Sequence, residues 1–282
     1  MINISQLSRS FLFVPGDRPE RFQKACSSGC DVVIIDLEDA VAKQNKEKAR
    51  DEVIKYLLNR DLEKNNIFIR INSIKTFQGI KDIIAFIENN SFPDGLVLPM
   101  VDSDEEVKFV ENILKEFNSE LPLFAVIETP KGLTNVDKIA SSSKNLKMIG
   151  FGSADYSSQT GSSLSWNALI QGRSQIINAA GMSGILAIDG VWPDINDEQG
   201  LIAETRKIVD MGFKGKMAIH PKQILGIHEA FLPDLEQVNF AKDVINAYES
   251  NKGGVISVRG KMIDEPLVVS ARRILDIVDA SK

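Results

Sequence analysis

Short apolar runs alternate along the chain with longer segments in which apolar residues recur every three or four positions. The short runs are rich in β-branched residues and almost continuously apolar, which is typical of parallel strands buried on both faces. They predict eight strands, at residues 11–14, 32–36, 67–71, 95–98, 123–127, 148–151, 185–187 and 217–219. The segments between and after them predict helices at 19–28, 46–58, 78–89, 103–117, 132–141, 166–180, 197–211 and 221–231.

Eight β-α units in succession predict an α/β protein with a (β/α)₈ TIM barrel rather than an open doubly wound sheet. No GxGxxG fingerprint opens the first predicted helix, which weakens the alternative of a dinucleotide-binding fold. We expect the barrel to span residues 8–232. Residues 233–282 are too few for a second core and predict a C-terminal helical extension, with helices at 235–250 and 266–278. We expect this extension to pack on the barrel or on a neighbouring subunit.

The composition argues against several classes of function. A formal net charge of −6 without a basic cluster argues against nucleic acid as the main partner. No apolar run reaches the roughly 18 residues needed to span a bilayer, and the N-terminus lacks the features of a signal peptide, so we expect a cytoplasmic protein. Cys26 and Cys30 are too few for a disulfide framework, and with two histidines in the chain we expect no His-based zinc site.

Two carboxylates follow neighbouring predicted strands. Glu128 comes directly after the strand at 123–127, and Asp155 lies in the loop after the strand at 148–151. The carboxyl ends of neighbouring strands lie side by side in a parallel barrel, so these groups can meet at its rim and offer the oxygen ligands that Mg²⁺ prefers. Alternatively, Glu128 caps a helix and Asp155 sits in a turn, and the pair alone does not decide between these readings.

Other strand ends add charged groups to the same rim. Glu38 and Asp39 follow the second predicted strand, and Arg70 ends the third. Arg70 could clamp a substrate carboxylate with its planar guanidinium, or it could simply pair with the two acids. Gly16 and Arg18, after the first strand, are further candidates for substrate binding, although Gly16 could equally be a turn glycine. Such a rim fits a Mg²⁺-assisted reaction on a small carboxylated substrate.

Eight segments, from residue 10 to residue 275, together resemble the citrate lyase β-subunit-like branch of the HpcH/HpaI aldolase/citrate lyase family. They are SFLFVPGDRPERFQKA, DVVIIDLEDAVAKQNKEKAR, FIRIN, VIETPKGL, GFGSADY, AIDGVWPDINDEQGL, AIHPKQI and GKMIDEPLVVSARRIL. Any one of them is a weak signal, but eight in the same order and at the same spacing are specific.

The resemblance implies a barrel enzyme, usually a homotrimer or hexamer, that makes or breaks a C–C bond next to a thioester. It implies that Glu128 and Asp155 bind Mg²⁺. It also implies that Arg70 holds the substrate acid. Asp264, in the segment GKMID, would be a catalytic residue that reaches the active site of an adjacent subunit.

The leading interpretation is a lyase that cleaves a short 3-hydroxyacyl thioester, such as citramalyl-, malyl- or citryl-CoA, into an acyl-CoA and an α-keto acid by Mg²⁺-assisted retro-Claisen chemistry. Asp264 would exchange a proton with the thioester enolate. Glu38 and Asp39 would orient metal-bound water and Arg70. Alternatives are the β-subunit of citrate lyase, acting on citryl-acyl carrier protein, and a malate synthase-like enzyme that also hydrolyses the thioester. A non-catalytic binding barrel is an alternative from a different class.

Two positions depart from the family pattern. Met100 stands where many relatives have lysine, and Ala154 stands where many have an acidic residue. The loss of one cation and one anion together can preserve the charge balance while altering the pocket. These departures leave the identity of the substrate open more than the class of reaction.

Overall fold

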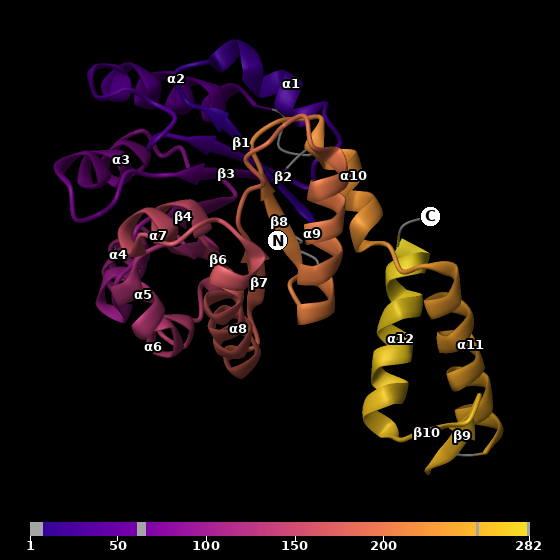
Figure 1. The fold of residues 1–282 in the computed structure, drawn as a ribbon. Coiled ribbons are helices and arrows are strands. Elements are labelled where there is room, and N and C mark those ends of the chain that lie inside the picture. The colour runs from indigo at the N-terminus through magenta and orange to yellow at the C-terminus, as the bar shows by residue number, and fades with distance from the viewer. Residues whose placement is uncertain (1–7, 61–65, 252–253, 281–282) are drawn as a thin grey trace. The chain divides into compact units, whose positions relative to one another are not determined.

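The computed structural model describes residues 8–60, 66–251 and 254–280. Eight parallel strands close into a barrel in the order of the sequence, and β1 also pairs with β8. This closure confirms the predicted (β/α)₈ barrel (Figure 1). The strands are β1 (Ser10–Pro15), β2 (Val32–Asp36), β3 (Asn66–Arg70), β4 (Gly95–Leu98), β5 (Leu123–Ile127), β6 (Leu146–Phe151), β7 (Leu186–Asp189) and β8 (Gly215–Ala218).

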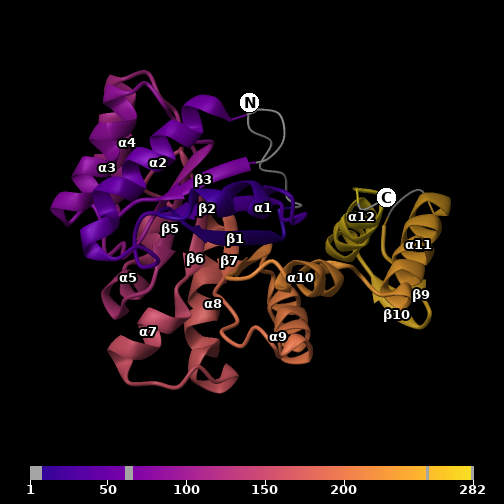
Figure 2. The ribbon, with the colours of Figure 1, turned by 90° about the horizontal axis from the view of Figure 1, so that it is seen from above.

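Helices between the strands lie around the outside of the barrel (Figure 2). They are η1 (Pro19–Arg21), α1 (Phe22–Cys26), η2 (Lys43–Asn45), α2 (Lys46–Asn59), α3 (Phe77–Glu88), α4 (Asp104–Glu116), α5 (Pro130–Thr134), α6 (Val136–Ala140), α7 (Ser153–Thr160), α8 (Trp166–Ser183) and α9 (Glu198–Met211). After β8 comes α10 (Gln223–Phe231).

Two helical predictions were wrong in detail. The helix expected at 132–141 is divided into α5 and α6 at Asn135, whose side-chain amide donates to the backbone carbonyl of Asp102 at 2.8 Å. The segment after β6, expected as a loop, forms α7, so Asp155 lies in the first turn of a helix. The α7 sequence, SADYSSQT, is polar and has no apolar period, which explains why the hydrophobic pattern misses it.

The inside of the barrel is filled by one apolar cluster. Its buried members alternate along the strands with residues that face the helices, as expected for strands covered on both sides. They are Phe11, Val32, Ile34, Phe68, Val97, Phe124, Val126, Met148, Ile188 and Met217. In the described part of the chain, no helix is long and apolar enough to cross a membrane.

The described residues divide into two compact units, the first ending at Ile227 and the second beginning at His228. In the second unit, α11 (Leu235–Ser250) packs against α12 (Glu265–Ala280), and the antiparallel strands β9 (Ile256–Val258) and β10 (Lys261–Ile263) connect them. The short hairpin was not predicted. A capping box between Asp234 and Gln237 begins α11. The apolar cluster of this unit includes Val244, Ile263 and Val268.

Three buried charged side chains and the partly buried Glu204 link β7 and β8 to the helices outside them. Asp189, at the end of β7, accepts hydrogen bonds from Arg173 Nε at 2.8 Å and Lys216 Nζ at 2.7 Å. Lys216 Nζ also donates to Glu204 Oε1 at 2.9 Å, and Arg173 Nη2 lies 3.2 Å from the same oxygen. Burial would raise the pKa of Asp189, but Lys216 and Arg173 hold it below its ordinary value. The two cations and two anions neutralise one another.

Replacing one member of this network should destabilise the barrel. Lys216→Met would leave Asp189, which is fully buried, with one cationic partner fewer. We expect the free energy of unfolding to fall by about 3 kcal/mol. This is the lower end of the range for breaking a buried ion pair, because Arg173 still pairs with Asp189. Urea denaturation followed by circular dichroism measures the change. Lys108→Met, which breaks an exposed pair with Asp104 on α4, is the control and should change little.

Candidate active site

A small pocket of about 80 Å³ opens at the carboxyl ends of the barrel strands. Arg70, Glu128 and Asp155 provide its charged lining, while Val126 and Met217 close it against the apolar interior. The pocket therefore gathers three of the residues that the sequence predicted, from the ends of three different strands. Its volume suits a small polar group and a few water molecules.

Glu128 directly follows β5 and is the most deeply buried carboxylate of the pocket, with a side chain 3% exposed. Its Oε1 accepts the backbone N–H of Met100 at 2.6 Å. Burial raises the pKa of Glu128 to about 7, although Arg70 and the Met100 N–H oppose the shift and Asp155 adds to it. A carboxylate in this environment would be stabilised by a nearby cation.

Asp155 lies beside Glu128, close enough for a side-chain hydrogen bond between the two carboxyl groups. Burial and the nearby Asp39 raise the pKa of Asp155, and Arg70 and Glu128 oppose this shift. Gly152 makes the approach possible, because a Cβ atom there would lie 2.3 Å from Glu128 Cβ and 2.5 Å from Glu128 Oε2. The strand ends thus bring the two predicted carboxylates together.

Arg70 is held in place by Asp36, the last residue of β2. Its Nε and Nη2 donate to the two oxygens of Asp36, at 2.7 and 2.6 Å. Nη1 lies 3.2 Å from Glu38 Oε2 and 3.6 Å from Asp39 Oδ2. The ring of Phe13 covers the guanidinium, with its centroid 4.8 Å from Cζ. Asp36 thus occupies Nε and Nη2, and a substrate carboxylate would share Nη1 with Glu38 and Asp39.

The pKa values of Asp36 and Glu38 are shifted in opposite directions. Burial would raise the pKa of Asp36, but the bidentate contact with Arg70 and two backbone N–H donors hold it below its ordinary value. Burial raises the pKa of Glu38 to about 8, with Asp39 and Glu128 adding to the shift against the opposing effect of Arg70. Glu38 Oε2 is buried and accepts no hydrogen bond from any described residue.

These carboxylates fit a hard cation. Glu128, Asp155 and Glu38 all have raised pKa values, chiefly because burial disfavours their charged forms, and a bound cation would offset this cost. Among the described residues, no group of three or more His, Cys, Asp or Glu side chains is arranged around a common metal position. An ion held by Glu128 and Asp155 would thus need further oxygen ligands from water or substrate, which is the usual manner of Mg²⁺.

The remaining predicted residues lie around or outside this pocket. The backbone N–H of Gly16 donates to the carbonyl of Asp36 at 2.8 Å, and a Cβ atom at Gly16 would lie 2.8 Å from that oxygen. Arg18 is exposed, and the described pocket lining does not include it. Asp264 belongs to the second unit, where its carbonyl accepts the N–H groups of Leu267 and Val268 at the start of α12.

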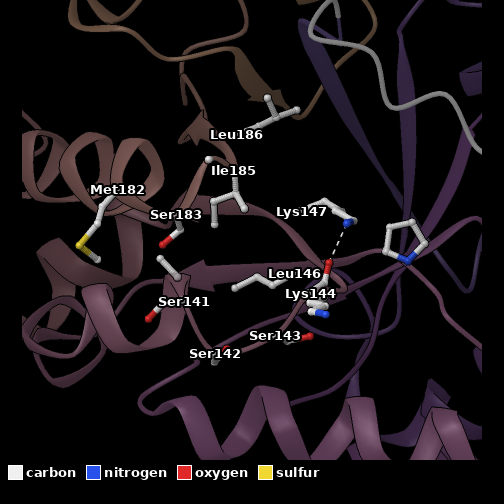
Figure 3. Close-up of a pocket in the computed structure, with 13 residues that line it drawn as sticks. Ser141, Ser142, Ser143, Lys144, Leu146, Lys147, Met182, Ser183, Ile185 and Leu186 are labelled. Atoms are coloured by element: carbon white, nitrogen blue, oxygen red, sulfur yellow. Dashed lines mark hydrogen bonds between the residues drawn. The ribbon is translucent and has the colours of Figure 1, made fainter.

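A larger hollow of about 1130 Å³ lies at the opposite, N-terminal ends of β6 and β7 (Figure 3). Its described lining includes Ser141, Lys144, Lys147 and Ser183 but no carboxylate. Lys147 Nζ donates to the backbone carbonyl of Lys144 at 2.6 Å. Chemistry in (β/α)₈ barrels takes place at the carboxyl ends of the strands. The smaller pocket is therefore the candidate site despite its size.

The fold and the pocket are those of a barrel enzyme. The model of the HpcH/HpaI aldolase/citrate lyase family matches residues 9–221, and the chain belongs to this family. It is 32% identical to citrate lyase subunit beta of Leuconostoc mesenteroides subsp. cremoris, over 99% of this chain and 96% of that one. It is 29% identical to the mitochondrial citramalyl-CoA lyase of Mus musculus, over 97% of this chain and 87% of that one.

A solved structure of a relative carries ligands. Protein CitE from Mycobacterium tuberculosis, in complex with magnesium, acetoacetate and coenzyme A, is 30% identical to this chain, with a TM-score of 0.84. The match covers 97% of this chain and 99% of that one. The family resemblance seen in the sequence is thus confirmed.

The raised pKa of Glu128 predicts a pH-dependent difference in stability between the metal-free protein and its Glu128→Gln variant. Between pH 4.5 and about 7 the folded state keeps a proton on Glu128 that the unfolded state releases. The free energy of unfolding should therefore fall as pH rises through this window, by the order of 2 kcal/mol, and the variant should lack this component. Urea denaturation in EDTA at several pH values measures it. Parallel pH profiles of the two proteins would contradict the prediction.

Proposed function

We propose that this protein is a Mg²⁺-dependent carbon–carbon lyase that cleaves a short 3-hydroxyacyl thioester of coenzyme A into an acyl-CoA and an α-keto acid. The observation that supports it most directly is the pair of the buried Glu128 and the more exposed Asp155 beside Arg70, at the catalytic end of a barrel of this family. Citramalyl-, malyl- and citryl-CoA are the candidate substrates. All three place a carboxylate near the bond to be broken.

In this proposal each residue of the pocket has a defined task. Glu128 and Asp155 hold Mg²⁺, which when bound polarises substrate oxygens and stabilises the charge that develops on them. Arg70 binds the substrate carboxylate through Nη1, while its contact with Asp36 keeps the guanidinium in place. Glu38, whose Oε2 makes no hydrogen bond with any described residue, orients Arg70 and a water molecule.

Cleavage moves protons in two places: the substrate hydroxyl loses one as the C–C bond breaks, and the enolate carbon gains one to complete the acyl-CoA. We assign the second transfer to Asp264 of a neighbouring subunit in a homotrimer or hexamer, with the second unit closing over the partner's pocket. Asp264 is half-buried and fixed at the start of α12, which would present its carboxyl group in a defined position. Gly16 and Arg18 would contact the coenzyme or acyl portion of the substrate.

A second candidate is the β-subunit of a citrate lyase complex, acting on citryl-acyl carrier protein. The 32% identity to such a subunit over nearly the whole chain supports it. The two functions use the same pocket and differ in the carrier of the acyl group. A panel of citramalyl-, malyl- and citryl-CoA, with citryl-acyl carrier protein alongside, tests both by following keto-acid release with Mg²⁺. Absence of release from every substrate would overturn the lyase proposal.

The metal assignment predicts that Glu128→Gln and Asp155→Asn lower Mg²⁺-dependent turnover by more than about 100-fold. Removing a residue that only hydrogen-bonds to a metal ligand typically costs about 10–100-fold, and removing the ligand itself should cost more. Both substitutions preserve side-chain shape, so the fold should remain, as circular dichroism can verify. Asp104→Asn on α4 removes a partly exposed carboxylate that does not belong to the described pocket lining, and it is the matched control. Full activity in either pocket variant would contradict the assignment.

The shared-site assignment predicts complementation between two inactive variants. Asp264→Asn supplies an intact metal pair, and Glu128→Gln supplies an intact Asp264. Mixed oligomers should contain some complete pockets and regain part of the wild-type activity. Differently tagged chains, purified in two affinity steps, yield verified mixed oligomers for the assay. If such oligomers remain inactive, Asp264 does not act across subunits.

A further inference from the structure

The carboxylate of Glu128 is oriented from two sides. Oε1 accepts the Met100 N–H at 2.6 Å, so Oε2 is the oxygen left more open to a ligand. On the side of Oε2, Gly152 has no side chain, and a Cβ atom there would lie 2.5 Å away. Because Glu128 is 3% exposed, few water molecules can substitute for the Met100 N–H if it moves. The direction of the carboxylate therefore depends on the backbone of Met100.

That backbone has an uncommon conformation. Met100 follows β4 and Pro99, and its φ angle of 54° places it in the left-handed region. Residues with a Cβ atom occupy this region only when their surroundings hold them there. Lys75 Nζ donates to the Met100 carbonyl at 2.5 Å. The next residue, Val101, donates its N–H to the carbonyl of Val126 at 3.3 Å.

Lys75 is itself fixed by a second contact. Its Nζ lies 2.8 Å from Asp102 Oδ2, and Asp102 Oδ1 accepts the hydroxyl of Thr129 at 2.5 Å. Thr129 follows Glu128 directly and accepts the N–H of Gly132 as the N-cap of α5. One ammonium group thus connects the turns after β3, β4 and β5. These contacts reach Glu128 at two points. The Met100 N–H binds its Oε1, and Thr129, which binds Asp102, is the next residue in the chain.

We infer that Lys75 is a positioning residue for the metal site: by holding the Met100 carbonyl it keeps the Met100 N–H on Glu128 Oε1. This inference rests on the proposed role of Glu128 in binding Mg²⁺. The described lining of the pocket does not include Lys75, which therefore acts through Met100. The alternative is that Lys75 and Asp102 form only an ordinary half-exposed ion pair. Such a pair would contribute little to stability, and its loss would not affect the metal site.

The test is metal affinity in the full-length protein. Lys75→Met keeps the aliphatic stem and removes the ammonium group. We expect the dissociation constant for Mn²⁺, measured from the electron paramagnetic resonance signal of the free ion, to rise about tenfold. The thermal unfolding midpoint should change little. Lys108→Met, in which an exposed lysine loses its bond to Asp104, is the matched control and should bind Mn²⁺ as the wild type does.

A second substitution separates positioning from a general structural effect. Glycine adopts positive φ angles without the penalty that a Cβ atom brings. In Lys75→Met/Met100→Gly the backbone can therefore return its N–H to Glu128 without the support of Lys75. We expect this double variant to recover most of the Mn²⁺ affinity lost in Lys75→Met. A loss caused by general disturbance of the three turns would not be recovered by removing a side chain.

Failure of the role inferred for Lys75 can be distinguished from failure of the proposed function. If Glu128→Gln abolishes Mn²⁺ binding but Lys75→Met binds with wild-type affinity, the positioning role of Lys75 is overturned and the metal site stands. A tenfold loss that Met100→Gly does not relieve also overturns it. If Glu128→Gln leaves Mn²⁺ binding intact, both the metal assignment and the positioning role fail.

Discussion

The bidentate contact between Arg70 and Asp36 determines the electrostatics of the whole rim. Of the described residues that line the pocket, Arg70 alone is a cation, and it opposes the raised pKa values of Glu38, Glu128 and Asp155. Asp36 holds this cation at the end of β3 and compensates part of its charge. The rim consequently has more carboxylates than cations, and two of these carboxylates, Glu38 and Glu128, lie where few water molecules can solvate them. A divalent ion would neutralise these carboxylates, and an acidic substrate bound with it could share Nη1 of Arg70 with Glu38 and Asp39.

The fold could be predicted from the sequence because eight short apolar runs, each long enough for one barrel strand, are separated by segments with a helical period. Elements without that signal were missed. The polar helix α7 and the three-residue strands β9 and β10 carry no apolar period long enough to recognise. The break between α5 and α6 depends on a contact of Asn135 with Asp102, more than thirty positions away, which local patterns do not reveal.

The candidate site was predictable to a similar extent. Arg70 ends β3, and Glu128 and Asp155 follow the neighbouring strands β5 and β6, so parallel topology alone places all three on one rim. The pairing of Arg70 was harder to foresee, because Asp36, Glu38 and Asp39 are all close in sequence and only the register of β2 with β3 selects Asp36. The part played by Lys75 depends on a left-handed residue at Met100 and on contacts between three loops. No spacing in the sequence encodes either. The structure also places a cation, the ammonium group of Lys75, at the Met100 turn.

The charge network of Arg173, Asp189, Glu204 and Lys216 also bears on how such a barrel can change over evolutionary time. Because they neutralise one another, a single substitution leaves an unbalanced charge in the interior, and a viable exchange requires two or more simultaneous changes. The β7–β8 quarter of the barrel should therefore drift slowly. The uncharged side chains of Met100 and Ala154 are not part of such a charge network. New substrate preferences are thus expected to arise at the turns after β4 and β6. The β7–β8 quarter of the barrel is expected to tolerate few substitutions.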